Sequence, residues 1–171
     1  MAGTINPEDA VNGIVSVLGA SLPAKLDTLD TAYTDAVVLE DIAAYLRAPQ
    51  ERYEVYPCAV IVARGSTRPD EFRNESIWWI SLEMQVYIVG NESLAAYQGV
   101  TLIPQELVTI RLQRTLRGIQ EVLEANTHLP VSGVHYADHV KIETVDFSDF
   151  APVEGGFLRG ARVSIQVLVA P

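Results

Sequence analysis

The sequence has a single cysteine, Cys58, which excludes an internal disulfide and a zinc site made of four thiolates. Positive charge is also scarce, because 12 Lys and Arg stand against 22 Asp and Glu, for a net charge of −10. Nucleic acids and anionic membrane surfaces are bound mainly through cations, so neither is expected as a direct partner. No run approaches the ~18 apolar residues of a membrane span, and the first ten residues lack the pattern of a signal peptide. We therefore expect a soluble chain that stays in the cytoplasm where it is made.

The motifs of common enzyme and cofactor sites are missing as well. The chain contains no GxSxG, no phosphate-binding Gly-Lys loop, no paired-glycine dinucleotide motif and no HExxH. His135 and His139 lie in a segment with the alternation of a strand, where four residues span about 13 Å, so the two cannot share a zinc ion. Cys58 lies in an apolar segment, where a thiol stays protonated and unreactive. We expect no catalytic residue, no metal site and no cofactor.

What is present is an ordinary globular composition. The chain has 171 residues, of which 49% are hydrophobic and 20% are charged. Because a domain typically has roughly 150 residues, we expect one domain over residues 1–171. A chain of this size can bury roughly 70% of its surface, which is enough for a core without disulfides or metals.

Two segments have the apolar spacing of amphipathic helices. The first begins after Asn6, which can cap it, and we expect Gly19 and Pro23 to end it. The second covers residues 104–126 and is the longer of the two. Its apolar stripe consists of Leu112, Leu116, Ile119 and Leu123, and its polar surface carries Arg111, Arg114 and Arg117. Residues 22–56 are harder to interpret, and form either a second short helix around 37–46 or a long irregular arm.

Four segments have the patterns of strands. Residues 58–63 are a compact β-branched run typical of a strand buried on both faces. Residues 77–89 alternate apolar and other side chains, which indicates a strand with one face in the core. Residues 134–142 and 162–169 alternate in the same way. We therefore predict an α+β fold, a two-layer sandwich of about four mostly antiparallel strands in two hairpins, covered by the two helices.

Two features are candidates for an interaction surface. The strand parity opposite the core carries Trp79 and Tyr87, residue types that subunit interfaces favour. The long connection over residues 64–76 mixes charges of both signs, and is either a solvated loop or an arm whose charges dock onto a neighbour. Its charged residues are Arg64, Arg68, Asp70, Glu71, Arg73 and Glu75.

The order of these elements resembles that of the tail terminator, or tail completion, proteins of tailed bacteriophages. The resemblance rests on an N-terminal helix, an arm, the Tyr56-Pro57 pair before an apolar strand, a long loop, an alternating strand, a long helix and a closing strand at 163–167. It covers nearly the whole chain, and residues 22–56 match least. The resemblance implies a non-enzymatic virion protein without cofactor, and it carries over no individual binding residue.

The resemblance also implies partners. Such proteins form a homohexameric ring that caps the tail tube, ends tube polymerisation, and contacts the neck or head-completion protein and, in contractile phages, the sheath. DNA passes through the lumen without specific binding. Six copies at −10 would carry about −60, and this charge would disfavour sticking of the passing phosphates. Alternatives are a neck or head-tail adaptor protein, a tube-related protein, a small-molecule-binding regulatory domain, or an enzyme.

Overall fold

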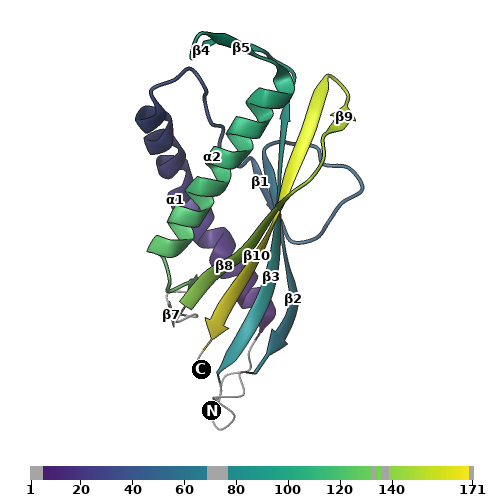
Figure 1. The fold of residues 1–171 in the computed structure, drawn as a ribbon. Coiled ribbons are helices and arrows are strands. Elements are labelled where there is room, and N and C mark those ends of the chain that lie inside the picture. The colour runs from purple at the N-terminus through teal and green to yellow at the C-terminus, as the bar shows by residue number, and fades with distance from the viewer. Residues whose placement is uncertain (1–5, 69–76, 132–133, 136–138, 170–171) are drawn as a thin grey trace.

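The computed structural model describes residues 6–68, 77–131, 134–135 and 139–169. Two helices, α1 (Pro7–Tyr33) and α2 (Pro104–Ala125), lie side by side on the same face of one mixed sheet (Figure 1). The order of its strands is β1-β2-β3-β10-β8, and β9 pairs with the start of β10. Their bounds are β1 Ala44–Leu46, β2 Cys58–Thr67, β3 Trp78–Gly90, β8 His139–Phe147, β9 Ala151–Val153 and β10 Gly156–Val169. The predicted α+β class is confirmed, with more strands than the four expected.

Both predicted hairpins are present. β2 pairs antiparallel with β3, with Ile61 opposite Met84, and β8 pairs antiparallel with β10, with Val145 opposite Val163. The inner strands β3 and β10 then pair antiparallel with each other. Two small ribbons lie apart from this sheet: β4 (Leu94–Tyr97) with β5 (Val100–Leu102), and β6 (Pro130–Val131) with β7 (Val134–His135). The main sheet therefore ends in β1 on one side and β8 on the other.

The core lies between the helices and this sheet, and it follows the predicted periodicities. Along β3 the even-numbered residues from Ile80 to Ile88 are buried, and the residues between them are half-buried. The predicted α2 stripe, from Leu112 to Leu123, is buried against them. Apolar burial on this scale supplies most of the stability of a domain.

The predicted end of the first helix is wrong. Asn6 caps α1 as expected, with its Oδ1 accepting a hydrogen bond from Glu8 N at 3.1 Å. The helix then continues through Pro23 to Tyr33. A proline inside a helix removes one backbone hydrogen bond. Leu22, just before Pro23, and Leu26 and Leu29, after it, are nevertheless all buried. Burial of this continuous stripe outweighs the lost hydrogen bond.

The segment between α1 and β2 contains no second helix, and the irregular stretch expected as the alternative is interrupted by a short strand. After Tyr33 the chain becomes extended, with Val37 and Leu39 buried, and it then forms β1, which pairs parallel with β2. Short-range spacing had suggested a helical stripe here. The backbone hydrogen bonds of residues 44–46 go to β2 instead, a long-range pairing that local patterns do not encode.

Two strand boundaries also differ from the predictions. Of the segment expected as one strand over 134–142, β7 pairs with β6, whereas β8, which extends to Phe147, pairs with β10; residues 136–138 lie outside the described residues. The expected loop 64–76 begins later, because β2 continues to Thr67. Polar residues such as Arg64 are tolerated there because the end of β2 is exposed.

Candidate functional site

The outer face of the sheet, which the helices do not cover, carries a continuous chain of polar contacts. Tyr87 Oη donates to Gln85 Oε1 at 2.6 Å, and Gln85 Nε2 donates to Glu83 Oε1 at 2.6 Å. Arg64 donates to the same carboxylate through Nη2 at 2.8 Å and Nε at 3.2 Å, and Arg162 Nε lies 3.5 Å from it. The hydrogen bond from Arg64 holds the pKa of Glu83 below its usual value. Both arginines on this part of the face are therefore held by a carboxylate.

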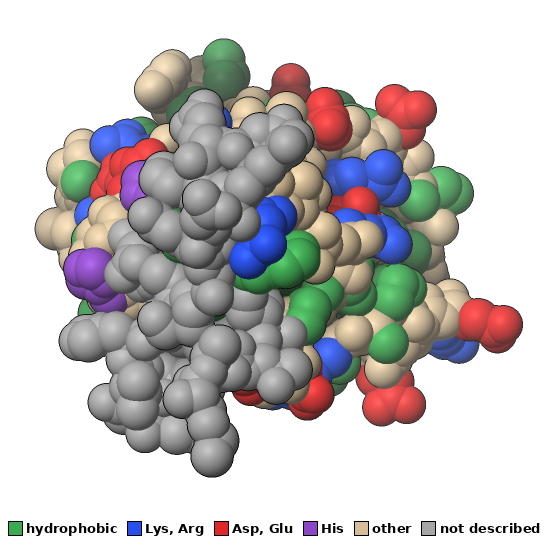
Figure 2. Space-filling model, turned by 90° about the horizontal axis from the view of Figure 1, so that it is seen from below, with side chains coloured by type: hydrophobic (Ala, Val, Ile, Leu, Met, Phe, Trp, Pro, Cys, Tyr) green, Lys and Arg blue, Asp and Glu red, His purple; other side chains and the backbone are tan. Residues whose placement is uncertain are grey.

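The other half of the face continues this pattern toward β8. The side chains of Ser81 and Gln166 are hydrogen-bonded across the strands, and Gln166 Nε2 donates to Glu143 Oε2 at 3.2 Å. Lys141 Nζ lies 3.9 Å from Glu143. Positive and negative side chains also lie next to one another on the described part of the end seen in Figure 2. Opposite charges are thus interleaved on the described surface here.

Trp79 and Tyr87 both lie on this outer face, as predicted, but each is partly covered by its own chain. The Tyr53 ring stacks on Tyr87 with centroids 5.0 Å apart, and Tyr56 contacts Tyr53 edge-on at 6.3 Å. Burial raises the pKa of Tyr87 to about 12. The His139 ring meets Trp79 edge-on at 6.4 Å. A groove of about 690 Å³ remains between residues 49–56 and the β9 turn.

The predicted docking loop is only partly described. Arg64 belongs to β2 and is bound to Glu83, and Arg68 is exposed with its guanidinium 5.5 Å from the Trp78 ring. Asp70, Glu71, Arg73 and Glu75 lie outside the described residues.

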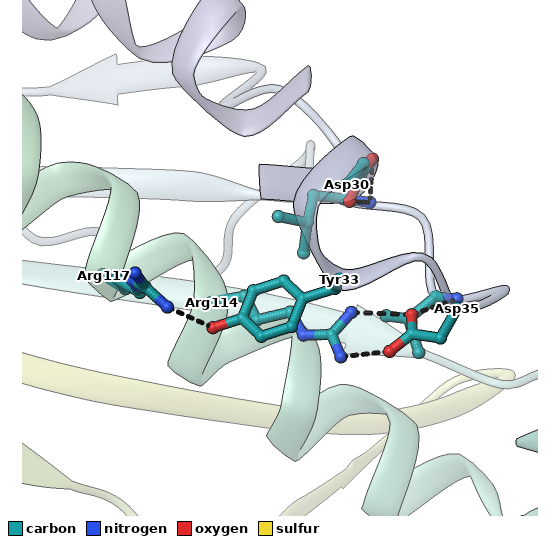
Figure 3. A network of polar contacts seen from close by, with 7 residues as sticks. Asp30, Tyr33, Asp35, Arg114 and Arg117 are labelled. Carbon is teal, nitrogen blue, oxygen red and sulfur yellow. Dashed lines mark hydrogen bonds and ion pairs between the residues drawn. The ribbon is translucent and has the colours of Figure 1, made fainter. Parts of the chain in front are cut away.

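The three arginines of α2 differ in a way that the sequence did not indicate. Arg114 is buried and donates to both carboxylate oxygens of Asp35, at 2.8 and 2.5 Å (Figure 3). Its guanidinium also lies 3.8 Å from the centroid of the Tyr33 ring. This hydrogen bonding lowers the pKa of Asp35. Arg117 donates to Tyr33 Oη and Arg111 to Val38 O, so all three hold the 33–38 segment against α2.

An apolar groove of about 260 Å³ lies between α2 and the edge strand β8. We call it the α2–β8 groove. Leu116 and Ile119 line it from the helix, and Ile142, Val145 and Phe147 line it from the strand. The other described lining side chains include Arg117 and two glutamines, but no carboxylate. The sequence did not indicate this groove. Its signal is a set of apolar residues at the end of an edge strand, and a strand can be identified as an edge strand only once the strand order is known.

The candidate reactive residues are placed as follows. Cys58 is fully buried, and burial raises the pKa of its thiol to about 11, so it is protonated at neutral pH. His135 and His139 belong to different strands, β7 and β8. Within the described ranges, no group of three or more His, Cys, Asp and Glu side chains is arranged to hold a metal ion.

Two comparisons complete this description. Neither a search against protein-family models nor a search of curated proteins found a match to the sequence. Neither described helix is long and apolar enough to cross a membrane.

Proposed function

We propose that this chain is the tail terminator of a tailed bacteriophage. In this proposal it is a structural virion protein, assembled in the host cytoplasm, whose copies form a hexameric ring on the end of the tail tube. The ring ends tube polymerisation and joins the tail to the neck or head-completion protein and, in a contractile tail, to the sheath. No reaction and no cofactor are involved.

The observation that carries the proposal is the open, one-sided sheet. The helices cover one face only (Figure 1), and within the described residues the sheet order stops at β1 and β8. The other face carries half-buried side chains along β3 and β10 and exposed ones along β8 and at the end of β2. A chain with different surfaces on its two sides can bind head to tail, and such contacts close into a ring when the rotation from copy to copy adds up to a full turn. In the proposed ring the helices lie outside, and the sheet face without helices lines the lumen.

The chemistry of that bare face suits the passage of DNA. Arg64 and Arg162 are both held by Glu83, and Lys141 faces Glu143. Phosphates are attracted by cations that can release counterions, and cations already paired with carboxylates offer less of this attraction. A lumen lined by this face would therefore let DNA slide without capturing it.

The proposal is tested with the tail-tube protein encoded by the same genome. Purified chain is added to polymerising tube protein at increasing molar ratios, and tube lengths are measured by electron microscopy. An unrelated acidic protein of the same mass is the control. We expect shorter tubes with a cap at one end. Unchanged lengths and bare ends would contradict the proposal, and binding to portal-side proteins instead would favour a neck adaptor.

A further inference from the structure

One edge of the main sheet is open at β8. In the described part of the chain, β8 pairs with β10 on one side and with no strand on the other. A register shift opposite Ser164 and Ile165 interrupts the middle of β8, whereas from Thr144 to Phe147 its register with β10 is regular. Irregular edges discourage the addition of a strand. An added strand is therefore expected beside residues 144–147.

The backbone of this half of β8 turns two residues toward the open side. Ser148 N, directly after β8, donates to Gly160 O of β10 at 2.9 Å. In an antiparallel pair, residues whose N–H and C=O face the partner strand alternate with residues whose groups face away from it. Asp146 therefore faces β10 as Ser148 does, and Val145 and Phe147 present their N–H and C=O groups to the open edge. Such groups pair with an extended segment of another protein.

The same two residues carry exposed apolar side chains on the helix side of the sheet. Val145 and Phe147 line the α2–β8 groove and are 39% and 44% exposed. Phe150, three residues beyond the strand, is 40% exposed. A segment that pairs with this edge covers these side chains best with apolar side chains of its own.

Arg159 of β10 adds a positive charge beside these rings. Its guanidinium lies 4.7 Å from the centroid of the Phe150 ring and 5.5 Å from that of Phe147. It donates to Thr109 Oγ1 at 2.5 Å and to Ser148 O at 3.3 Å, and among the described residues it pairs with no carboxylate. All three arginines of α2, by contrast, are paired with carboxylates. A half-buried guanidinium of this kind favours an anionic group on a partner.

Asp146 offers the opposite charge on the other face of the same edge. It lies between Val145 and Phe147, so strand alternation places its side chain on the face without helices. The residue is exposed, and no hydrogen bond or ion pair joins its carboxylate to another described residue. A cation opposite Asp146 on an added strand would form a favourable cross-strand pair, and a carboxylate there would be repelled.

From these observations we propose that residues 144–147 are the docking site for an extended segment of a partner protein. The segment adds a strand antiparallel to β8, the commoner pairing. On the helix side its apolar side chains cover Val145 and Phe147, and a carboxylate beyond Phe147 binds Arg159. On the other face a lysine or arginine lies opposite Asp146. This inference goes beyond the proposed function, because it describes a partner and does not require a closed ring.

Two peptides of the same composition test the charge pattern. The first, acetyl-Ser-Glu-Thr-Val-Lys-Val-Ser-amide, places its valines beside Phe147 and Val145, its glutamate toward Arg159 and its lysine opposite Asp146. The second exchanges the glutamate and the lysine, so each charge meets a like charge. Each peptide carries a fluorescent label, and its anisotropy is measured as the purified full chain is added. We expect the second peptide to bind at least about tenfold more weakly, because both charge pairs are lost.

Three variants, each checked for cooperative unfolding, test the individual residues. Val145→Asp puts a carboxylate into the apolar contact and should abolish binding of the first peptide. Val100→Asp is the matched control and should bind like the wild type, because Val100 is 59% exposed on β5, in a ribbon apart from the main sheet. Arg159→Gln should weaken the first peptide about tenfold, but not a peptide with glutamine in place of the glutamate. Equal losses for these two peptides would contradict the binding role of Arg159.

The titrations with the two peptides of the same composition decide the proposal. Equal binding of the two, binding that survives Val145→Asp, or no binding of the first peptide to the wild type would overturn it. If no peptide binds and Val145→Asp breaks up the wild-type assembly in native mass spectrometry, a second copy occupies the edge, and the proposal is overturned as well. The tube-length assay of the proposed function is measured separately, so either proposal can fail alone.

Discussion

Arg114 is the residue at which charge and burial are most closely combined. Its side chain is 7% exposed and that of Asp35 is 15% exposed, and the two form a bidentate pair beneath the Tyr33 ring. Removing one partner of such a pair strongly destabilises a protein, because the other charge then stays buried without its partner. The pair closes the turn that follows α1 and thereby positions the extended segment that leads to β1.

Replacing Arg114 by alanine should therefore destabilise the protein more than replacing its neighbour. We expect Arg114→Ala to lower the free energy of unfolding by about 2–3 kcal/mol. Arg117→Ala is the matched control, because that side chain is 56% exposed, and it should cost less than about 1 kcal/mol. Urea denaturation measures both values. Equal losses in the two variants would contradict a structural role for the buried pair.

Asp35 also gives a prediction on pH. Its hydrogen bonds to Arg114 lower its pKa in the folded state below the ordinary value of 3.8. The stabilisation is therefore complete above 3.8 and is lost as the pH falls through the lower, folded pKa. The difference in unfolding free energy between wild type and Asp35→Asn should be constant near neutral pH and shrink on acidification below 3.8. A difference that does not depend on pH would contradict this assignment.

At the residue scale the sequence indicated little of this. The strand alternation correctly placed Trp79 and Tyr87 on the outer face, because that pattern depends only on neighbours along the chain. It could not predict that Tyr53 covers Tyr87, or that Arg114 meets a carboxylate 79 residues away. These contacts depend on the path of the chain after α1, and no local pattern specifies that path.

At the scale of elements, the sequence predicted those helices and strands correctly in which a regular apolar pattern extends over many residues. The strand β3 and the helix α2 each bury one face over many residues, and both were predicted close to their observed bounds. α1 was predicted too short because Pro23 and Gly19 were interpreted as an end. Gly118 of α2 explains part of the difference: a Cβ there would lie 2.9 Å from Leu26 Cδ2, so the two helices pack closely beyond Pro23.

This packing implies that Pro23 weakens a helix that other residues hold in place. We expect Pro23→Ala to raise the free energy of unfolding by about 2 kcal/mol, because alanine restores the missing hydrogen bond and removes the steric conflict. Pro104 is the matched control, since proline is well tolerated at the first position of a helix. Thermal unfolding of Pro23→Ala and Pro104→Ala compares them. A lower melting temperature for Pro23→Ala would contradict this account of α1.

For the molecule as a whole, the layer arrangement could be predicted and the order of strands could not. Two amphipathic helices and alternating strands require a two-layer sandwich, whichever way the strands pair. The edge position of β8, and with it the α2–β8 groove, follows only once β3 and β10 are seen to pair in the centre. The net charge of −10 likewise gave no indication that Glu83 would hold Arg64 and Arg162 on the bare face.

The most direct test of the central claim is the mass and shape of the purified chain in solution. Native mass spectrometry over a range of concentrations, with electron microscopy of the same samples, measures both. The account predicts closed rings with a mass close to six times 18.7 kDa. Particles of 18.7 kDa at every concentration, with or without the tail-tube protein, would contradict it.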